Sequence, residues 1–445
     1  MKKASWLLFL ILFFPVAGSA QDPVTLREAI ELALKKNFQL RESTSRREAA
    51  KHSVAVARSR YFPRISLEEA AAVSNSPTRT FMMKLDQGRF EQSDFELSNL
   101  NNPSSHGDFR TSFQVDIPLF DAAVAQGRKL AEENLISYDY FLERQRQDVA
   151  FQVYGAWLDI FRAKQFVLVA DQAVGTAAEH ARLAQVRAAT GTGLKSDELR
   201  ARTYLSEAEQ QKLTAENDLQ IARWRLAQLA GEESVSSLDV SDAFSPLPVD
   251  GDGEELIELA LRQRPDLKSG ETEVQKAATG VGLARSAYFP TLYGNASYQL
   301  NDRDIPFARD NDAWMAGVAL RWDIFDGFRR SSEISRAGAM RTAAEASIEN
   351  QRREVVLQVK EALLRREEAA RRLEVARRSV GDAEETVRLI RKRYENSLAT
   401  MVELLDAQTT LDRTKAQLVE HETGLARAAA RVLHTSGVFL QEVLK

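Results

Sequence analysis

The sequence predicts a mostly α-helical, internally duplicated chain in which each copy also carries a β-hairpin of the kind found in membranes. The segment Ala-Arg-Ser-Arg-Tyr-Phe-Pro at 57–63 returns as Ala-Arg-Ser-Ala-Tyr-Phe-Pro at 284–290, so the residue numbers differ by 227. Such a repeat sets the architecture of a whole chain. Alternating strand patterns follow both copies of the segment, and a long stretch without proline comes after each set of strands.

The first 20 residues have the form of a secretory signal peptide. Lys2 and Lys3 precede an apolar run at 6–16, and small residues at 18–20 precede Gln21. The run is too short to cross about 30 Å of hydrocarbon, so we expect residues 1–20 to be removed. No later segment offers about 18 uninterrupted apolar residues, and the sequence therefore predicts no membrane-spanning helix after export.

Composition excludes several classes of function. The chain has no cysteine, so neither disulfides nor a thioether lipid anchor are available. It carries 60 Lys and Arg against 64 Asp and Glu, and two of the Lys lie in residues 1–20, which leaves a mature net charge of −6. This mild acidity does not indicate a nucleic-acid partner. Without a nucleophile elbow, phosphate loop or metal-ligand spacing, we expect no enzyme activity, cofactor or metal site.

Each copy begins with a helix that leads into a hairpin. A capping-box pattern at 25–28 starts the first helix, whose apolar periodicity continues to about Arg58 before Pro63 stops it. Hairpins are predicted at about 61–120 and 288–325. Each strand alone is compatible with an ordinary half-buried strand. Two hairpins flanked by aromatic residues at matching places in a repeat favour tilted membrane strands of about 9–11 residues.

The two hairpins differ in length. Phe-Asp at 120–121 matches Phe-Asp at 325–326 with a shift of 205, so the first hairpin holds 22 more residues than the second. The excess lies within about 75–109, which is rich in Asn, Ser and Gly. We therefore expect a long exposed loop there.

Very long helices follow both hairpins. The proline-free stretches 121–189 and 326–396 would each extend about 100 Å as a helix. A helix of this length needs partners along its whole length, and the coiled-coil-like spacing of its apolar residues indicates such packing. Turns at about 190–193 and 396–399 then lead into return helices.

These elements divide the chain into matched parts. The first copy covers 21–230 and the second covers 254–436. Between them, 231–253 is rich in Ser, Asp and Pro, and we expect a linker that packs against the middle of the helices. Residues 437–445 form a C-terminal tail.

These motifs occur in the same order in both copies, and together they resemble the TolC-like outer membrane efflux protein family. The Ala-Arg-Ser-x-Tyr-Phe-Pro entry, the Phe-Asp exit, and Tyr394 followed by Leu-Leu-Asp-Ala-Gln at 404–408 carry the resemblance. It implies a homotrimer in contact with outer-membrane lipid, with four strands per chain in one 12-stranded β-barrel. A long α-helical coiled-coil barrel would continue into the periplasm. Four strands alone leave open edges that lipid does not tolerate, which independently indicates trimerisation.

The resemblance implies the exit duct of a tripartite efflux or type I secretion system. An inner-membrane pump and a periplasmic adaptor protein would deliver the substrate to a channel that is gated at its periplasmic end. Drugs, metal ions and polypeptides are all substrates within the family. The alternative is a periplasmic coiled-coil adaptor or scaffold without a barrel, since helical hairpins of that class have similar patterns.

The resemblance also places a periplasmic gate. Glu403 and Asp406, three residues apart on one helix face, would form acidic rings in the lumen. Such rings would raise the pKa of their carboxyl groups and favour cations. The alternative for both acids is a solvated helix face. Polar links between neighbouring helices would come from the remaining gate residues: Tyr394, Asp197 and Ser196.

One residue of the expected gate departs from the family pattern. Ala399 stands where the family often has Arg, so a link through this position is missing and the closed state is looser or built differently.

The resemblance implies that the two turns contact the adaptor. The predicted contact residues are Gly191, Gly193, Leu194, Ser397 and Leu398. The alternative interpretation is that both turns only terminate their helices.

Overall fold

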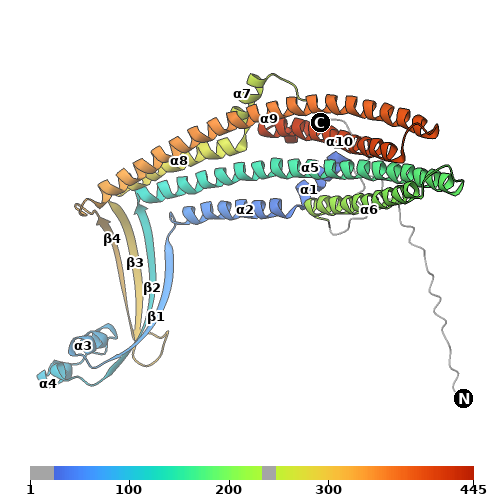
Figure 1. Cartoon of the computed structure of the whole chain (residues 1–445). Helices are drawn as coiled ribbons and strands as arrows, with labels where there is room; N and C mark the ends of the chain where they lie inside the picture. Colours follow the sequence, from blue (N-terminus) through green and yellow to red (C-terminus); the bar gives the residue numbers. More distant parts are fainter. Residues whose placement is uncertain (1–24, 233–246, 445) are drawn as a thin grey trace, which may run out of the picture.

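A long helical body carries a four-stranded sheet at one end (Figure 1). The computed structural model describes residues 25–232 and 247–444, so the expected signal peptide at 1–20 and residues 233–246 of the expected linker lie outside the described residues. The predicted fold class is confirmed, because the chain is mostly helical, with four antiparallel strands and two repeats. Within the described ranges, no helix has the length and apolar character needed to cross a membrane.

The repeat is exact at the start of each copy. Helices α1 (Leu26–Lys36) and α2 (Phe38–Ser59) correspond to α7 (Gly253–Gln263) and α8 (Pro265–Ser286), and every boundary shows the same shift of 227. The capping box predicted at the start of α1 is present. Local sequence therefore sets these helix ends in the same way in both copies.

The prediction of one continuous first helix at 25–58 is wrong, because the chain breaks at Asn37. This residue has an extended ψ of 130°, and its side-chain oxygen accepts hydrogen bonds from N–H groups in the first turn of α2. Its amide nitrogen donates to the carbonyl of Leu229 at 2.8 Å. In the second copy Arg264 has the same place before Pro265, and a proline forces extended backbone on the residue before it.

The strands of both copies form one antiparallel sheet in the order β1-β2-β3-β4. The central pair joins β2 of the first copy to β3 of the second, so the sheet connects the two repeats. Strands β1 and β4 form the edges. The bounds are β1 Arg64–Ser74, β2 His106–Phe120, β3 Thr291–Asp302 and β4 Asn311–Arg321.

One face of this sheet is apolar and exposed. Leu67, Phe113, Tyr298 and Trp314 lie directly opposite one another across the four strands, and directly paired residues share a face. All four side chains are exposed, and Trp314 reaches 78%. An exposed apolar patch of this kind marks contact with lipid or protein. The adjacent row on the other face is mainly polar: Glu68, Ser112, Gln299 and Ala313.

The long loop predicted at about 75–109 is wrong in part, because this segment is folded. Three of its phenylalanine rings pack edge to face with centroids 4.5 to 6.5 Å apart. Arg89 reaches Asp310, beside the turn between β3 and β4, at 2.7 Å, which ties this lobe to the second hairpin. The lobe lies at the end of the sheet away from the long helices (Figure 1). It contains α3 (Pro77–Asp86), the 3-10 turn η1 (Gln92–Phe95) and α4 (Leu97–Asn101).

Two helical hairpins make up most of the body. Helix α5 (Ala122–Ala189) has 68 residues and α9 (Arg329–Glu395) has 67, each running about 100 Å from the sheet to a turn. Helices α6 (Lys195–Ala230) and α10 (Met401–Thr435) return from these turns. Helix α5 packs against α6, and α9 packs against α10.

The main core lies at the middle of the helical body. Tyr154 of α5 is buried there against Phe439, with ring centroids 5.6 Å apart. Phe439 belongs to α11 (Phe439–Val443), so the C-terminal tail is a short helix packed into the core. Leu247 and Val249 from the described end of the linker pack against the same core.

Candidate functional site

The predicted site residues lie in or beside the two helix turns, at the end of the molecule far from the sheet (Figure 1). The first turn joins α5 to α6 and the second joins α9 to α10. A small apolar cluster packs the four helix ends together and so brings the two turns side by side. Its members are Ala181, Ala184, Ala201, Tyr394, Met401 and Leu404.

The first turn ends α5 with a Schellman motif. The N–H of Thr192 donates to the Arg187 carbonyl at 3.0 Å, and the N–H of Gly191 donates to the Ala188 carbonyl at 3.3 Å. Gly191 has a φ of 74°, which glycine adopts without strain. A Cβ added to Gly193 would stand 2.8 Å from the Cβ of Arg187. Glycine therefore avoids strain at position 191 and a steric clash at position 193.

The second turn has the same motif without a glycine. The N–H of Leu398 donates to the Arg393 carbonyl at 2.8 Å, and the N–H of Ser397 donates to the Tyr394 carbonyl at 3.0 Å. Ser397 occupies the place of Gly191 with a φ of 61°. A left-handed conformation costs an L-residue about 1–2 kcal/mol, so the second turn stores strain that the first turn avoids.

Glu403 and Asp406 lie on the solvent side of the first turns of α10. Both are exposed, whereas Leu404 between them is buried. A carboxylate oxygen of Glu403 accepts hydrogen bonds from the Thr400 backbone N–H at 2.7 Å and from the Thr400 hydroxyl at 3.0 Å. The bond from the backbone N–H lowers the pKa of Glu403 below its ordinary value. This effect within the chain is opposite in sign to the pKa rise that we expect from a ring of like charges.

Tyr394 is buried beneath the turns and contacts Arg187. The guanidinium carbon of Arg187 lies 4.6 Å from the centre of the Tyr394 ring. Burial raises the pKa of Tyr394. Asp197 is half-buried and Ser196 is exposed. Within the part of the chain that the structure describes, no hydrogen bond joins the Tyr394 and Asp197 side chains, so the predicted partners are close without being linked.

Sequence reasoning missed Arg187. The repeat could have pointed to this residue. Arg187 and Arg393 differ by 206 in residue number, which is the same shift that relates Gly191 to Ser397. Each Arg stands four residues before the left-handed residue of its turn. The pattern alone does not say which carbonyls either guanidinium reaches.

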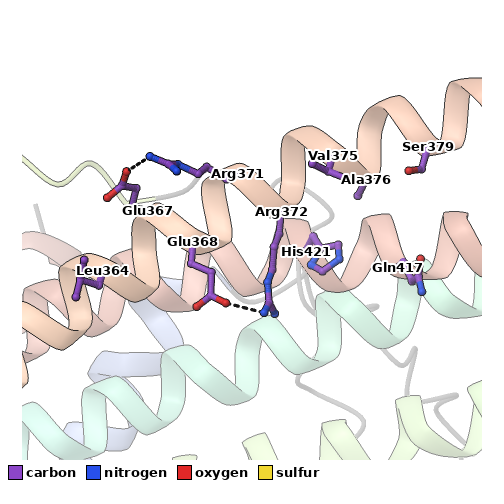
Figure 2. Close-up of a pocket in the computed structure, with 10 residues that line it drawn as sticks. All are labelled: Leu364, Glu367, Glu368, Arg371, Arg372, Val375, Ala376, Ser379, Gln417 and His421. Carbon is purple, nitrogen blue, oxygen red and sulfur yellow. Dashed lines mark hydrogen bonds and ion pairs between the residues drawn. The ribbon is translucent and has the colours of Figure 1, made fainter.

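A groove of about 770 Å³ lies between α9 and α10, away from the turns. Figure 2 shows that α9 supplies most of its lining, while Gln417 and His421 come from α10. Its charged residues form ion pairs one helical turn apart, such as Glu368 with Arg372 at 2.6 Å, which is ordinary helix-surface chemistry. Among the described residues, no group of His, Asp and Glu has an arrangement that could hold a metal ion.

Comparison with known proteins assigns the chain to a family. The sequence profile of the family described as "Outer membrane efflux protein" matches residues 29–232 and 256–438. The chain belongs to the outer membrane efflux protein family. It is therefore an outer membrane channel protein of efflux pumps and type I secretion systems, and it is not an enzyme. This result excludes the adaptor or scaffold alternative.

Two relatives match over most of their length. Proteases secretion protein PrtF of Dickeya chrysanthemi is 23% identical over 99% of this chain and 94% of its own. Protein CyaE of Bordetella pertussis is 26% identical over 95% of this chain and 86% of its own. The crystal structure of the Campylobacter jejuni CmeC outer membrane channel superposes with a TM-score of 0.78 at 16% identity, covering 93% of this chain and 86% of that one. The shared fold is the TolC-like fold of trimeric channels.

We predict that Ser397→Gly stabilises the second turn. The change removes about 1–2 kcal/mol of left-handed strain and adds about 0.5–1 kcal/mol of backbone entropy cost, for a net gain of about 0.5–1 kcal/mol. Amide hydrogen exchange at 394–400 should slow about two- to fivefold, since local opening sets this rate. Gly191→Ser is the matched control and should accelerate exchange at the first turn. Faster exchange in Ser397→Gly would contradict the assignment of strain.

Proposed function

We propose that three copies of this chain form an outer membrane exit duct that receives substrate from an inner-membrane pump through a periplasmic adaptor. The observation that carries the proposal is the sheet, whose exposed apolar face and two unpaired edges are joined end-on to helices of about 100 Å. Unpaired edges are not viable in lipid. Pairing β4 of each chain with β1 of the next would close three four-stranded sheets into one.

The long helices then extend on the periplasmic side of the membrane. Their length accounts for the distance between the sheet and the turns, and it brings the turns toward the inner-membrane components. Family members function as trimers with pump components. Two relatives from Pseudomonas putida carry the names solvent and toluene efflux pump outer membrane protein, which supports a pump partner for this chain.

We propose that the ends of the four long helices form the gate of this duct. Glu403 and Asp406 are exposed on one face of α10, which is where lumen-lining acids must be. Tyr394, Asp197 and Ser196 lie at the adjoining helix ends, and Tyr394 is packed in the apolar cluster beneath the turns. Movement of these helix ends would widen or narrow the duct at the place where the acids stand.

We predict that replacing both acids, Glu403→Ala with Asp406→Ala, raises single-channel conductance and lowers cation selectivity, because the acidic rings are removed. The measurement is planar-bilayer recording of the purified channel. Glu403 also caps α10, so Glu403→Gln with Asp406→Asn is the matched control: it keeps side-chain size and the cap while removing charge. Selectivity should fall equally in both variants. Unchanged conductance and selectivity would contradict a lumen position.

We also propose that the turn tips dock on the adaptor. Leu194 and Leu398 are 66% and 69% exposed at the far end of the molecule, which leaves apolar surface for a partner. Gly191, Gly193 and Ser397 keep the tips narrow beside them. The two tips together therefore offer one apolar contact surface.

We predict that Gly191→Lys weakens adaptor binding, because a Cβ added at this position has open space around it and a long charged side chain would project from the tip. The measurement is the affinity of the channel for its adaptor in a pull-down. The adaptor used is the one whose gene lies beside the gene of the pump. Gly191→Asn is the matched control, since Asn tolerates the left-handed conformation without adding charge. Equal affinity for the wild-type and Lys proteins would contradict a docking role for this tip.

A further inference from the structure

The 75–109 lobe lies on the polar face of the sheet. In β2, His106 and Asp108 stand at even positions, and they therefore share a face with Ser112. The Gln87 side chain of the lobe reaches both: its amide nitrogen donates to an Asp108 carboxylate oxygen at 2.9 Å, and its amide oxygen lies 2.8 Å from Nε2 of His106. The lobe thus covers the polar face at the end of the strands away from the long helices (Figure 1).

The far edge of the sheet holds the lobe from the same side. Asn311 begins β4 and shares the polar face with Ala313, and its side-chain nitrogen donates to the carbonyl of Asp86 at 3.1 Å. Arg89 binds both carboxylate oxygens of Asp310, at 2.7 and 3.0 Å. Because the lobe begins after β1 and its helix α3 contacts β2 and β4, it crosses the polar face from one edge of the sheet to the other.

The contact between lobe and sheet excludes water from the polar groups within it. Asp108 is 2% exposed, and the Gln87 side chain that binds it is 1% exposed. Asp108 also accepts a hydrogen bond from the side chain of Asn301 in β3 at 3.0 Å. A buried carboxylate is tolerated only where its hydrogen bonds are made, so these bonds give the lobe one defined position on the sheet.

The lobe has a core of its own. The rings of Phe81, Phe90 and Phe95 pack against one another, and Lys84 pairs with Asp94 at 2.6 Å within the lobe. The hydrogen bonds and ion pairs to the sheet, in contrast, come from a few polar side chains. A unit with an internal aromatic core and a small polar contact opens as one body, because breaking the contact does not unfold it.

Three such lobes are large enough to fill the mouth of the duct. Three four-stranded sheets closed into one barrel, with strands about 4.8 Å apart and tilted by about 40°, have a circumference of about 75 Å and a diameter of about 24 Å. A helix with its side chains is about 10 Å across. Helix α3 of each chain lies over the inner, polar face, and three helices of this width nearly fill the mouth.

We propose that the 75–109 lobe is a lid on the outer mouth of the duct, seated by Gln87 and Arg89, and that it limits by size what passes. In the closed state three lobes stand across the mouth. In the open state each lobe leaves the polar face as a unit and swings on its connections to β1 and β2, residues 75–76 and 102–105. The lid rests on the trimeric duct proposed above.

The test measures access to the duct from outside the cell. The chain has no cysteine, so Ser112→Cys gives a single thiol on the polar face, about 13 Å further along β2 than Asp108. Whole cells that carry the channel are treated with a bulky maleimide-polyethylene glycol or with a small charged methanethiosulfonate, and the rate of modification is measured. Phe113→Cys, on the apolar face, is the control for side and should react with neither reagent.

A disulfide that locks the lobe to β4 gives a second control. A Cβ added at Gly88 would lie 3.5 Å from the Cβ of Asn311, which is within the range of disulfides. Gly88→Cys with Asn311→Cys is therefore combined with Ser112→Cys, so that oxidation leaves only the thiol at position 112 free. Gly88 has a left-handed φ of 67°, which strains any other residue, and oxidation is therefore verified on non-reducing gels before labelling.

We expect the small reagent to modify the thiol at position 112 in every variant, and the bulky reagent to modify it slowly in the chain with the native lobe. Arg89→Ala should raise the rate with the bulky reagent about fivefold, because charge-assisted hydrogen bonds to the second hairpin are lost. Arg79→Ala removes an exposed lobe arginine that has no ion pair within the described ranges, and it should leave the rate unchanged. The oxidised disulfide should restore the slow rate in Arg89→Ala.

Equal rates with the bulky reagent for the native lobe and Arg89→Ala would overturn the lid. A faster rate in Arg89→Ala that the disulfide does not slow, or that Arg79→Ala reproduces, would also overturn it, because general loosening of the mouth would then explain the access. In these cases the small reagent still reaches position 112, and the duct itself stands. If the small reagent reaches position 113 and not position 112, the polar face does not line a duct, and the proposed function fails together with the lid.

Discussion

A helix of 68 residues is not stable in isolation as a straight rod in water, and the packing of α5 along its whole length is the constraint on which the rest of the structure depends. Helix α5 contacts α1, α2 and α6 of its own copy, α8 and α10 of the second copy, and α11 of the C-terminal tail. Near the turns, small side chains repeat at intervals of three and four and let other helices approach closely. These buried residues are Ala170, Ala173, Ala177, Ala181 and Ala184. Burial of this alanine stripe away from water therefore helps to hold the helices of both repeats together.

The sheet takes its position from the same helices. Asp121 directly follows β2 and caps α5 by accepting a hydrogen bond from the N–H of Ala123 at 2.8 Å, so a single residue joins strand and helix. The second copy makes this connection through Asp326, which binds the guanidinium of Arg330 at 3.0 Å. In the second copy residues 322–328 separate β4 from α9, so the sheet takes its position from the direct connection of β2 to α5 and from the pairing of β2 with β3. The exposed apolar face follows from strand alternation, which places the apolar side chains of the paired strands on one side of the sheet.

The turns show how the two copies of a duplicated chain come to differ. Both turns have the two hydrogen bonds of a Schellman motif, yet the first uses Gly191 and the second uses the strained Ser397. Glu403 of the second copy caps α10 through Thr400, and the guanidinium of Arg187 in the first copy bridges to backbone carbonyls at the end of α9 in the second. In a trimer, the two similar turns of each chain would alternate around the duct. The differences between the copies decide that the second turn is followed by the acids and that the first turn supplies the bridging Arg187.

The sequence by itself determined the elements: the internal repeat, the helix ends set by local caps, both hairpins and both turns. These features depend on residues close together in the chain, so periodicity and capping patterns are sufficient to find them. The break at Asn37 depends on its bond to Leu229, and the folding of the 75–109 lobe depends on aromatic packing and on Arg89, so both required the tertiary structure. The same holds for Arg187. The repeat marks its position, but only the packing of the helix ends at the two turns brings its guanidinium to the distant carbonyls of Tyr394 and Glu395. Hydrogen bonds and ion pairs act over a few ångströms, and which distant residues come within that range is decided by how the helices pack.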